Sequence, residues 1–380
     1  MIVVRGSRQR PLSRRALVVG AILVAALLLV GALALWHLPR PHISVLFPAR
    51  PVAYTFVAGH LAKIDPTSGV ILTRSAEQYG DQFPSLAVSH DGGALFLLHA
   101  AVVNGQTSDQ LIILSAATLA PAASVSVEHF MSSMDAWPPA LAVTSDDRTV
   151  VVYQYGDNEN SPFWLSYYDR ASSRFLADQT ILPACGVAQL LPVGEQLAVL
   201  CFGTGQVYLV NLATHHVSAT VQLDLPSGDA IGLPVAAASI PDQNAIVVVE
   251  SHGRLFRVDL TTHAVSLITS LVTTDGQFAP VVAAAFSDNG RVAVSVATNK
   301  DDASAGQARD LLIADTSDGR LLEEVPVLSR YTLTMAPDGR RVFLRGDSNT
   351  LYQLDLTTRR LSAFGPEADR TWVHLIFARR

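Results

Sequence analysis

Short apolar stretches alternate with polar turns from Val52 to the end of the chain, and no convincing amphipathic helix interrupts them. Each stretch has the length of a β-strand and is bounded by glycine, proline, asparagine or aspartate. This pattern predicts an all-β protein built from repeated hairpins rather than a mixed fold.

Two kinds of turn recur along this region. The first follows a strand of small residues, as in LAVSHDGGALFLL and AAAFSDNGRVAVSV, and occurs six times. It carries an acidic residue in each copy: Asp91, Asp146, Glu195, Asp242, Asp288 and Asp338. The second follows an outer strand, as in LFRVDLTTHAV, and occurs seven times. Neighbouring copies lie about 40 to 56 residues apart, which is the spacing of four-stranded propeller blades.

The aspartates of these turns have a structural explanation. Aspartate and asparagine tolerate a left-handed backbone and bond to the amides of their own turn, and glycine supplies a positive φ. We therefore expect these carboxylates to form hairpins rather than to bind a cation.

The two counts differ by one, and the ends of the chain explain the difference. The first outer turn, at Asp65, has only VAYTFVAG (52–59) before it, without an inner strand or an Asp-Gly turn. At the other end, TWVHLIFARR (371–380) reads as an inner strand that nothing follows. We predict that this last strand pairs with VAYTFVAG, completes the first blade and leaves the ring without a free edge.

These repeats resemble those of seven-bladed β-propellers of the YVTN and WD-repeat-like class. The resemblance rests on SDNGRVAVSV with LLIADTSDGRLLEEV, and on APDGRRVFLRG with LYQLDLTTRRLSAF, and it covers residues 52–380. It implies an all-β, seven-bladed propeller. The Trp-Asp and Gly-His pairs of true WD repeats are missing from these blades. Propellers of this kind include binding modules, sensor domains and some enzymes, so the resemblance implies no single activity.

The first fifty residues predict a membrane anchor. Residues 16–36 carry no charge and no proline, and such a helix is long enough to cross a bilayer. Residues 1–15 form a basic tail with five arginines, which places the N-terminus in the cytoplasm and the rest outside. Residues 37–51 form a proline-rich spacer before the propeller at 52–380. A secretory signal cleaved near Ala34 is the alternative, and both interpretations export the propeller.

Composition and charge narrow the function. The chain of 380 residues is 49% hydrophobic, which suits a large core, and its net charge of −6 comes with no basic stripe. We therefore exclude nucleic acid as a partner. The two cysteines, Cys185 and Cys201, flank one expected hairpin. Outside the cytoplasm they are able to form a disulfide, but two buried thiols are an equally open interpretation.

No catalytic motif, cofactor fingerprint or metal-binding spacing occurs in the sequence. His215 and His216 lie in an outer turn, where adjacent side chains point in opposite directions and do not easily hold one metal ion. We expect both histidines at the surface. We accordingly predict no catalytic residues, no cofactor and no metal site from local motifs.

The best candidate site is the mouth of the central channel. Long hairpin loops, such as YGDNENSPFW and TNKDDASAGQARD, are expected on one face, together with the segments that enter the inner strands. Five entry segments place an acid before a large apolar residue. These residues are Asp81 and Phe83, Asp135 and Trp137, Asp229 before Leu233, Asp275 and Phe278, and Asp369 and Trp372. They either shape the entry turns of the repeat or form a ring suited to a cationic or peptide-like ligand.

The sequence thus predicts a membrane-anchored, extracytoplasmic propeller that binds or scaffolds a protein or peptide partner without catalysis. The alternative is a propeller enzyme, either a lactonase-like hydrolase or a cofactor-dependent oxidoreductase, with its site at the channel mouth. Convergent polar groups with shifted pKa values would favour the enzyme.

Overall fold

The computed structural model describes residues 52–79, 85–103, 106–127, 141–154, 163–182, 185–202, 204–223, 232–240, 243–271, 280–297, 310–327, 332–345, 350–365 and 375–378. All of them belong to one unit of the chain, Pro51–Arg380. Within the described ranges, no helix is long and apolar enough to span a membrane. The predicted anchor at 16–36 lies outside those ranges.

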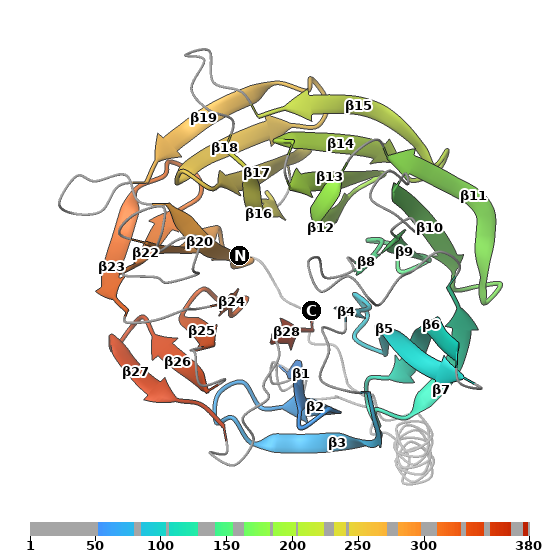
Figure 1. Cartoon of the computed structure of the whole chain (residues 1–380). Coiled ribbons are helices and arrows are strands. Elements are labelled where there is room, and N and C mark those ends of the chain that lie inside the picture. Colours follow the sequence, from blue (N-terminus) through green and yellow to red (C-terminus); the bar gives the residue numbers. More distant parts are fainter. Residues whose placement is uncertain are drawn as a thin grey trace, which may run out of the picture. The chain divides into compact units, whose positions relative to one another are not determined.

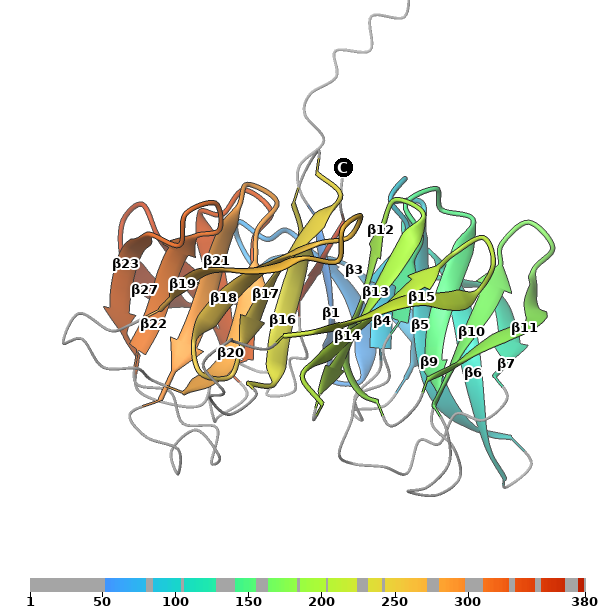
Figure 2. The same cartoon turned by 90° about the horizontal axis from the view of Figure 1, so that it is seen from above.

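Seven antiparallel sheets of four strands each are arranged in a ring around a central axis (Figure 1). The view turned by 90° shows the sheets standing side by side, with most strands running between the two faces of the ring (Figure 2). The unit is therefore an all-β, seven-bladed propeller, as the sequence predicted. We number the blades from the one that contains β1.

The first four blades have the following strands, written from the centre outward. Blade 1 contains β28 (Ile376–Phe377), β1 (Ala53–Val57), β2 (His60–Ile64) and β3 (Ile71–Gln78). Blade 2 contains β4 (Ser85–Val88), β5 (Ala94–Val103), β6 (Gln106–Ser115) and β7 (Pro121–Ser126). Blade 3 contains β8 (Leu141–Val143), β9 (Thr149–Gln154), β10 (Phe163–Asp169) and β11 (Arg174–Leu182). Blade 4 contains β12 (Gly186–Val193), β13 (Gln196–Phe202), β14 (Gln206–Asn211) and β15 (His216–Gln222).

The remaining three blades follow the same plan. Blade 5 contains β16 (Pro234–Ser239), β17 (Ala245–Glu250), β18 (Arg254–Asp259) and β19 (Val265–Ser270). Blade 6 contains β20 (Val281–Phe286), β21 (Arg291–Val296), β22 (Asp310–Asp315) and β23 (Leu321–Pro326). Blade 7 contains β24 (Thr332–Met335), β25 (Arg341–Arg345), β26 (Leu351–Asp355) and β27 (Arg360–Ala363).

The two ends of the propeller sequence meet in blade 1. The last strand, β28, runs antiparallel to β1, with Ile376 opposite Tyr54 and Phe377 opposite Ala53. The backbone N–H of Ala378 also donates to the carbonyl oxygen of Val52 at 3.2 Å. This confirms the predicted ring closure, in which the C-terminal strand becomes the innermost strand of the first blade.

The apolar core lies between the blades. Seven clusters of buried side chains are present, and each joins two neighbouring blades around the ring. The cluster between blades 7 and 1, for example, packs Phe343 and Phe364 against Val57 and Ile64. Because a strand presents alternate side chains to its two faces, each blade fills the interface on both of its sides.

The recurring turns owe their aspartates to hydrogen bonding, as predicted. In the first kind of turn, Asp91 accepts from the hydroxyl of Ser89 at 2.6 Å and from the N–H of Gly93 at 2.8 Å. In the second kind, Asp355 accepts from the N–H groups of Thr357 and Thr358 at 2.9 and 2.8 Å. These bonds lower the pKa of Asp91 and of Asp355.

One predicted turn residue is wrong. In blade 6 the hydroxyl of Ser287 donates to Asn289 at 2.6 Å, so Asn289 takes the part that we assigned to Asp288. The amide also donates to the carbonyl oxygen of Asp338 in blade 7 at 2.7 Å, which a carboxylate is unable to do. Asparagine at this turn therefore links two blades as well as shaping the hairpin.

Candidate functional site

The predicted residues of the channel mouth lie outside the described part of the chain. They are Asp81, Phe83, Asp135, Trp137, Asp229, Asp275, Phe278, Asp369 and Trp372. Where their side chains point, and whether they gather around the channel, therefore stays a prediction.

The described ends of two entry segments contribute to the repeat itself. In blade 5, Leu233 accepts from the N–H of Ser251, and its own N–H donates to the Ser251 hydroxyl at 3.1 Å. In blade 6, Pro280 accepts from the N–H of Ala297 at 2.9 Å. Both contacts fasten an entry segment to the hairpin of its own blade.

The described inner strands present an uncharged surface to the central channel. Six of the seven consist of small or apolar residues with an occasional hydroxyl, as in PVAAAS of β16 and VVAAAF of β20. The amide of Gln189 on β12 bridges to Ala237 on β16, accepting from its N–H at 2.8 Å and donating to its carbonyl at 3.1 Å. The polar group of this wall thus joins blades 4 and 5.

A buried ion pair lies at the hairpin between β17 and β18. Glu250 accepts from the backbone N–H of Arg254 at 3.0 Å and from its guanidinium at 2.8 Å, and it lies 3.0 Å from Nδ1 of His252. Burial opposes the charged form of Glu250, but the hydrogen bonds from Arg254 and His252 outweigh it and lower its pKa. The carboxylate also lies against Gly232, where an added Cβ would be 1.2 Å from Oε2.

A cleft of about 480 Å³ opens between blades 2 and 3. Its lining comes from three strands of blade 3 and from the end of β7 in blade 2. The lining residues are Val125, Ser126, Gln154, Ser166, Arg174, Phe175, Leu176, Ala177 and Gln179.

Three neutral polar side chains form a connected row in this cleft. The hydroxyl of Ser166 on β10 donates to Oε1 of Gln154 on β9 at 3.2 Å, and it accepts from Nε2 of Gln179 on β11 at 3.3 Å. Gln154 and Ser166 are buried. Because the row crosses three neighbouring strands, the sheet of blade 3 fixes the spacing of its amide and hydroxyl groups.

An irregularity in β11 shapes the outer wall of the cleft. Between the pairs Ser166–Gln179 and Tyr168–Phe175, β10 has one residue whereas β11 has three. The extra residues of β11 bulge away from the regular ladder, as bulges in edge strands do. Arg174 and Phe175 begin this strand, so the cleft combines a cation, an aromatic ring and hydrogen-bonding amides.

This cleft was not predicted from the sequence. Its sequence signal is modest: Ser166 is a small polar residue at a position where most other blades carry a large apolar one. A comparison of the blades position by position would have found it.

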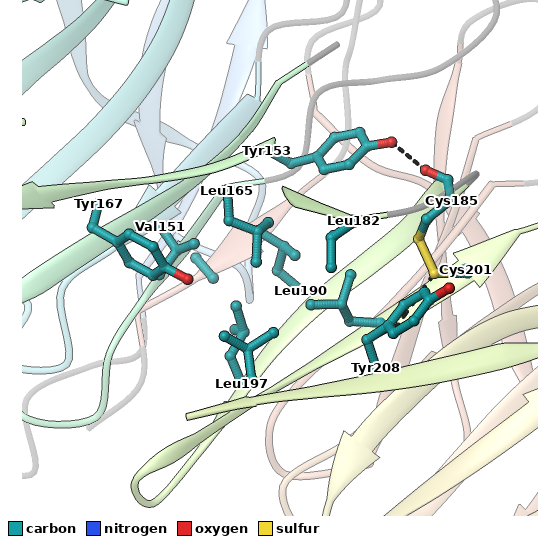
Figure 3. Close-up of a cluster of buried hydrophobic side chains, with 13 residues drawn as sticks. Val151, Tyr153, Leu165, Tyr167, Leu182, Cys185, Leu190, Leu197, Cys201 and Tyr208 are labelled. Carbon is teal, nitrogen blue, oxygen red and sulfur yellow. Dashed lines mark hydrogen bonds between the residues drawn. A yellow bond between two sulfur atoms is a disulfide. The ribbon is translucent and has the colours of Figure 1, made fainter. Parts of the chain in front are cut away.

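The two cysteines are joined in the structure. Cys185 and Cys201 form a disulfide with a Cα–Cα distance of 5.0 Å, at the inner end of the β12–β13 hairpin. Figure 3 shows the bond at the edge of the cluster between blades 3 and 4, and the hydroxyl of Tyr153 donates to the carbonyl oxygen of Cys185. The disulfide and this hydrogen bond connect blade 3 to the start of blade 4.

His215 is buried, contrary to the surface position that we expected. Its ring stacks on Tyr167 of blade 3 with the centroids 3.9 Å apart, and its carbonyl oxygen accepts from Thr180 at 2.5 Å. His216 is exposed, so the two neighbours do point in different directions. Among the described residues, no group of three or more histidine, cysteine or acidic side chains is placed to hold a metal ion.

Comparison with known proteins supports the fold. No family model and no curated protein matches the chain. Similar solved structures include a functionally unknown protein from Desulfotomaculum acetoxidans DSM 771, at a TM-score of 0.60 and 13% identity over 86% of this chain and 98% of that one.

U3-55K is similar at a TM-score of 0.55 and 11% identity, over 78% of this chain and 85% of that one. Kuenenia stuttgartiensis hydrazine synthase is similar at a TM-score of 0.51 and 15% identity, over 74% of this chain and 79% of that one. At these identities the likeness shows the propeller fold alone.

Proposed function

We propose that this chain is a propeller of the YVTN and WD-repeat-like class that binds a protein or peptide partner and acts as a non-catalytic binding or scaffolding module. The observation that carries the proposal is the cleft between blades 2 and 3. Its polar floor consists of neutral amides and a hydroxyl, which match the hydrogen-bonding groups of a peptide.

The described carboxylates have structural tasks that fit this proposal. Those of the recurring turns, such as Asp91, accept hydrogen bonds from their own hairpins. Glu250 is held by Arg254, and the bonds that lower its pKa keep it charged. A propeller hydrolase or oxidoreductase with its site at the channel mouth is the second candidate, because the acidic entry segments of the sequence surround that mouth.

We further propose that the propeller lies outside the cytoplasm, anchored by residues 16–36, with cleavage of that segment as the alternative. The uncharged segment and the five arginines before it support the anchor. The Cys185–Cys201 disulfide supports the oxidising compartment, since such bonds persist mainly in exported proteins.

Crosslinking tests the function. The full-length chain is displayed on its native host cells, crosslinked and purified, and we expect a protein partner to be recovered in proportion to the amount of propeller. A chain that recovers no partner but turns over a lactone or a redox substrate would contradict the binding module. Mass spectrometry of the mature N-terminus, which should retain residues 16–36, tests the anchor.

A further inference from the structure

The cleft marks a position where blade 3 departs from the other blades. The third strand of each blade leads into the second kind of turn, which begins at Asp65, Ser115, Asp169, Asn211, Asp259, Asp315 or Asp355. Three residues before each of these positions lie, in blade order, Ala62, Ile112, Ser166, Tyr208, Phe256, Leu312 and Tyr352. Five of the seven are large and apolar or aromatic, whereas blade 3 has serine.

Elsewhere this position fills the interface with the preceding blade. Ile112 packs in the cluster between blades 1 and 2, Tyr208 in that between blades 3 and 4, and Leu312 in that between blades 5 and 6. In blade 3 the same face carries Ser166, and the cleft of about 480 Å³ opens there. The volume that a side chain of the protein occupies in the other interfaces is thus open to a ligand.

Blade 4 shows what such a side chain looks like. Tyr208 occupies the equivalent position, with its ring buried and its hydroxyl donating to Oε1 of Gln206 at 3.0 Å. The cleft beside blade 3 offers a similar environment, because Phe175 and Val125 supply apolar surface and Gln154 and Gln179 supply amides. An aromatic ring that ends in a hydroxyl group suits both parts.

Arg174 adds a charge preference at the start of β11. Its cross-strand neighbour, Asp169, accepts from the N–H of Ser172 at 3.0 Å and from the Ser172 hydroxyl at 2.5 Å. Because this carboxylate is used by its own turn, the guanidinium of Arg174 is available to attract an anion from a ligand in the cleft.

We propose that the cleft between blades 2 and 3 binds a partner peptide that inserts a tyrosine side chain beside Ser166 and places a neighbouring carboxylate near Arg174. This inference rests on the proposed function and names its partner class. The tyrosine replaces the side chain that other blades supply themselves, and its hydroxyl bonds to the amide row. The cleft exceeds the volume of a single ring, which leaves room for the flanking peptide backbone.

The probe is the tetrapeptide acetyl-Gly-Tyr-Glu-Gly-amide, titrated into the full-length chain by calorimetry. We expect saturable binding that weakens at least tenfold when the tyrosine is replaced by alanine or the glutamate by lysine. Ser166→Phe, which restores the bulk found in blade 5, should weaken binding by at least tenfold. Arg174→Ala should weaken it severalfold.

Matched controls separate binding from folding. Arg360→Ala removes the arginine that begins β27, the counterpart of Arg174 in blade 7, and should leave the affinity unchanged. Each variant is melted beside the parent. If Ser166→Phe lowers the melting temperature, Arg174→Ala carries the test, because its side chain is exposed.

Four outcomes would overturn the inference: no saturable binding, equal binding by the Tyr→Ala peptide, equal binding by the Ser166→Phe and Arg174→Ala chains, or 4-methylphenol binding as tightly as the tetrapeptide. The last would make the cleft a site for small phenols. If the tetrapeptide fails while crosslinking still recovers a partner, this inference is wrong and the proposed function stands. Substrate turnover without a partner would remove both.

Discussion

At the scale of single residues, the roles of polar side chains depend on whether their partners are near or far in sequence. The turn aspartates were predictable because Asp91 bonds to residues two positions away. The burial of His215 was not, since the ring that covers it, Tyr167, belongs to the preceding blade. The same reason hid the cleft, because Ser166 leaves a hollow only in relation to the side chains of blade 2.

Glu250 gives a residue-scale prediction about acid stability. Its pKa in the folded protein is lower than the ordinary value of 4.5, because hydrogen bonds from Arg254 and His252 outweigh the effect of burial. The unfolded chain therefore takes up the proton first. The stabilisation is complete above about pH 4.5 and is lost as the pH falls through the lower folded value.

Thermal melts between pH 7 and pH 3 measure this effect. We expect the melting temperature to fall below about pH 4.5, and to fall less steeply in Glu250→Gln, which has no carboxylate to protonate. The turn aspartates, whose pKa values are also lowered, contribute a slope of the same sign that remains in the variant. Identical slopes for parent and variant would show that the buried pair does not contribute.

At the scale of elements, the hairpin of β12 and β13 is reinforced beyond its ladder. Cys185 and Cys201 are 16 residues apart in sequence, and their disulfide closes the loop that contains both strands. Chain-entropy models assign about 3 kcal/mol to a loop of about 15 residues. The sequence left this bond open, because the cysteine spacing alone did not fix the distance between the two Cα atoms.

The double variant Cys185→Ala/Cys201→Ala tests this bond. We expect a loss of about 3 kcal/mol in the free energy of unfolding, measured by denaturant titration. Thiol labelling of the unfolded parent without reductant should find no free thiol. Two reactive thiols in that assay, with an unchanged stability of the double variant, would show that the cysteines are merely buried apolar residues.

At the scale of the whole molecule, the count of turns along the sequence was sufficient to predict seven blades and their closure. Strand and turn patterns are local, and the missing inner strand of the first blade left one arrangement that closes the ring. The side chains around the channel mouth were not predictable in the same way, since their positions depend on connecting segments of unequal length. The chemistry at that mouth therefore stays a prediction.

Removal of residues 371–380 tests the closure. The deletion takes away β28 and leaves the inner edge of β1 unpaired, and it removes the buried Leu375, whose burial alone is worth about 1.5–3 kcal/mol. We expect a lower melting temperature and aggregation at concentrations where the parent stays soluble. Removal of only the last two arginines is the control and should change neither property. A 371–380 deletion that melts like the parent would contradict the closure.

The pairing of β1 with β28 also sets an order on biosynthesis. The ribosome makes β1 among the first strands of the propeller and β28 last, so a partner for the inner edge of β1 is absent until almost the whole chain has been made. A product cut short at its C-terminus lacks this partner, even if its other six blades are complete. The final residues of the chain thus distinguish a finished molecule from an interrupted one.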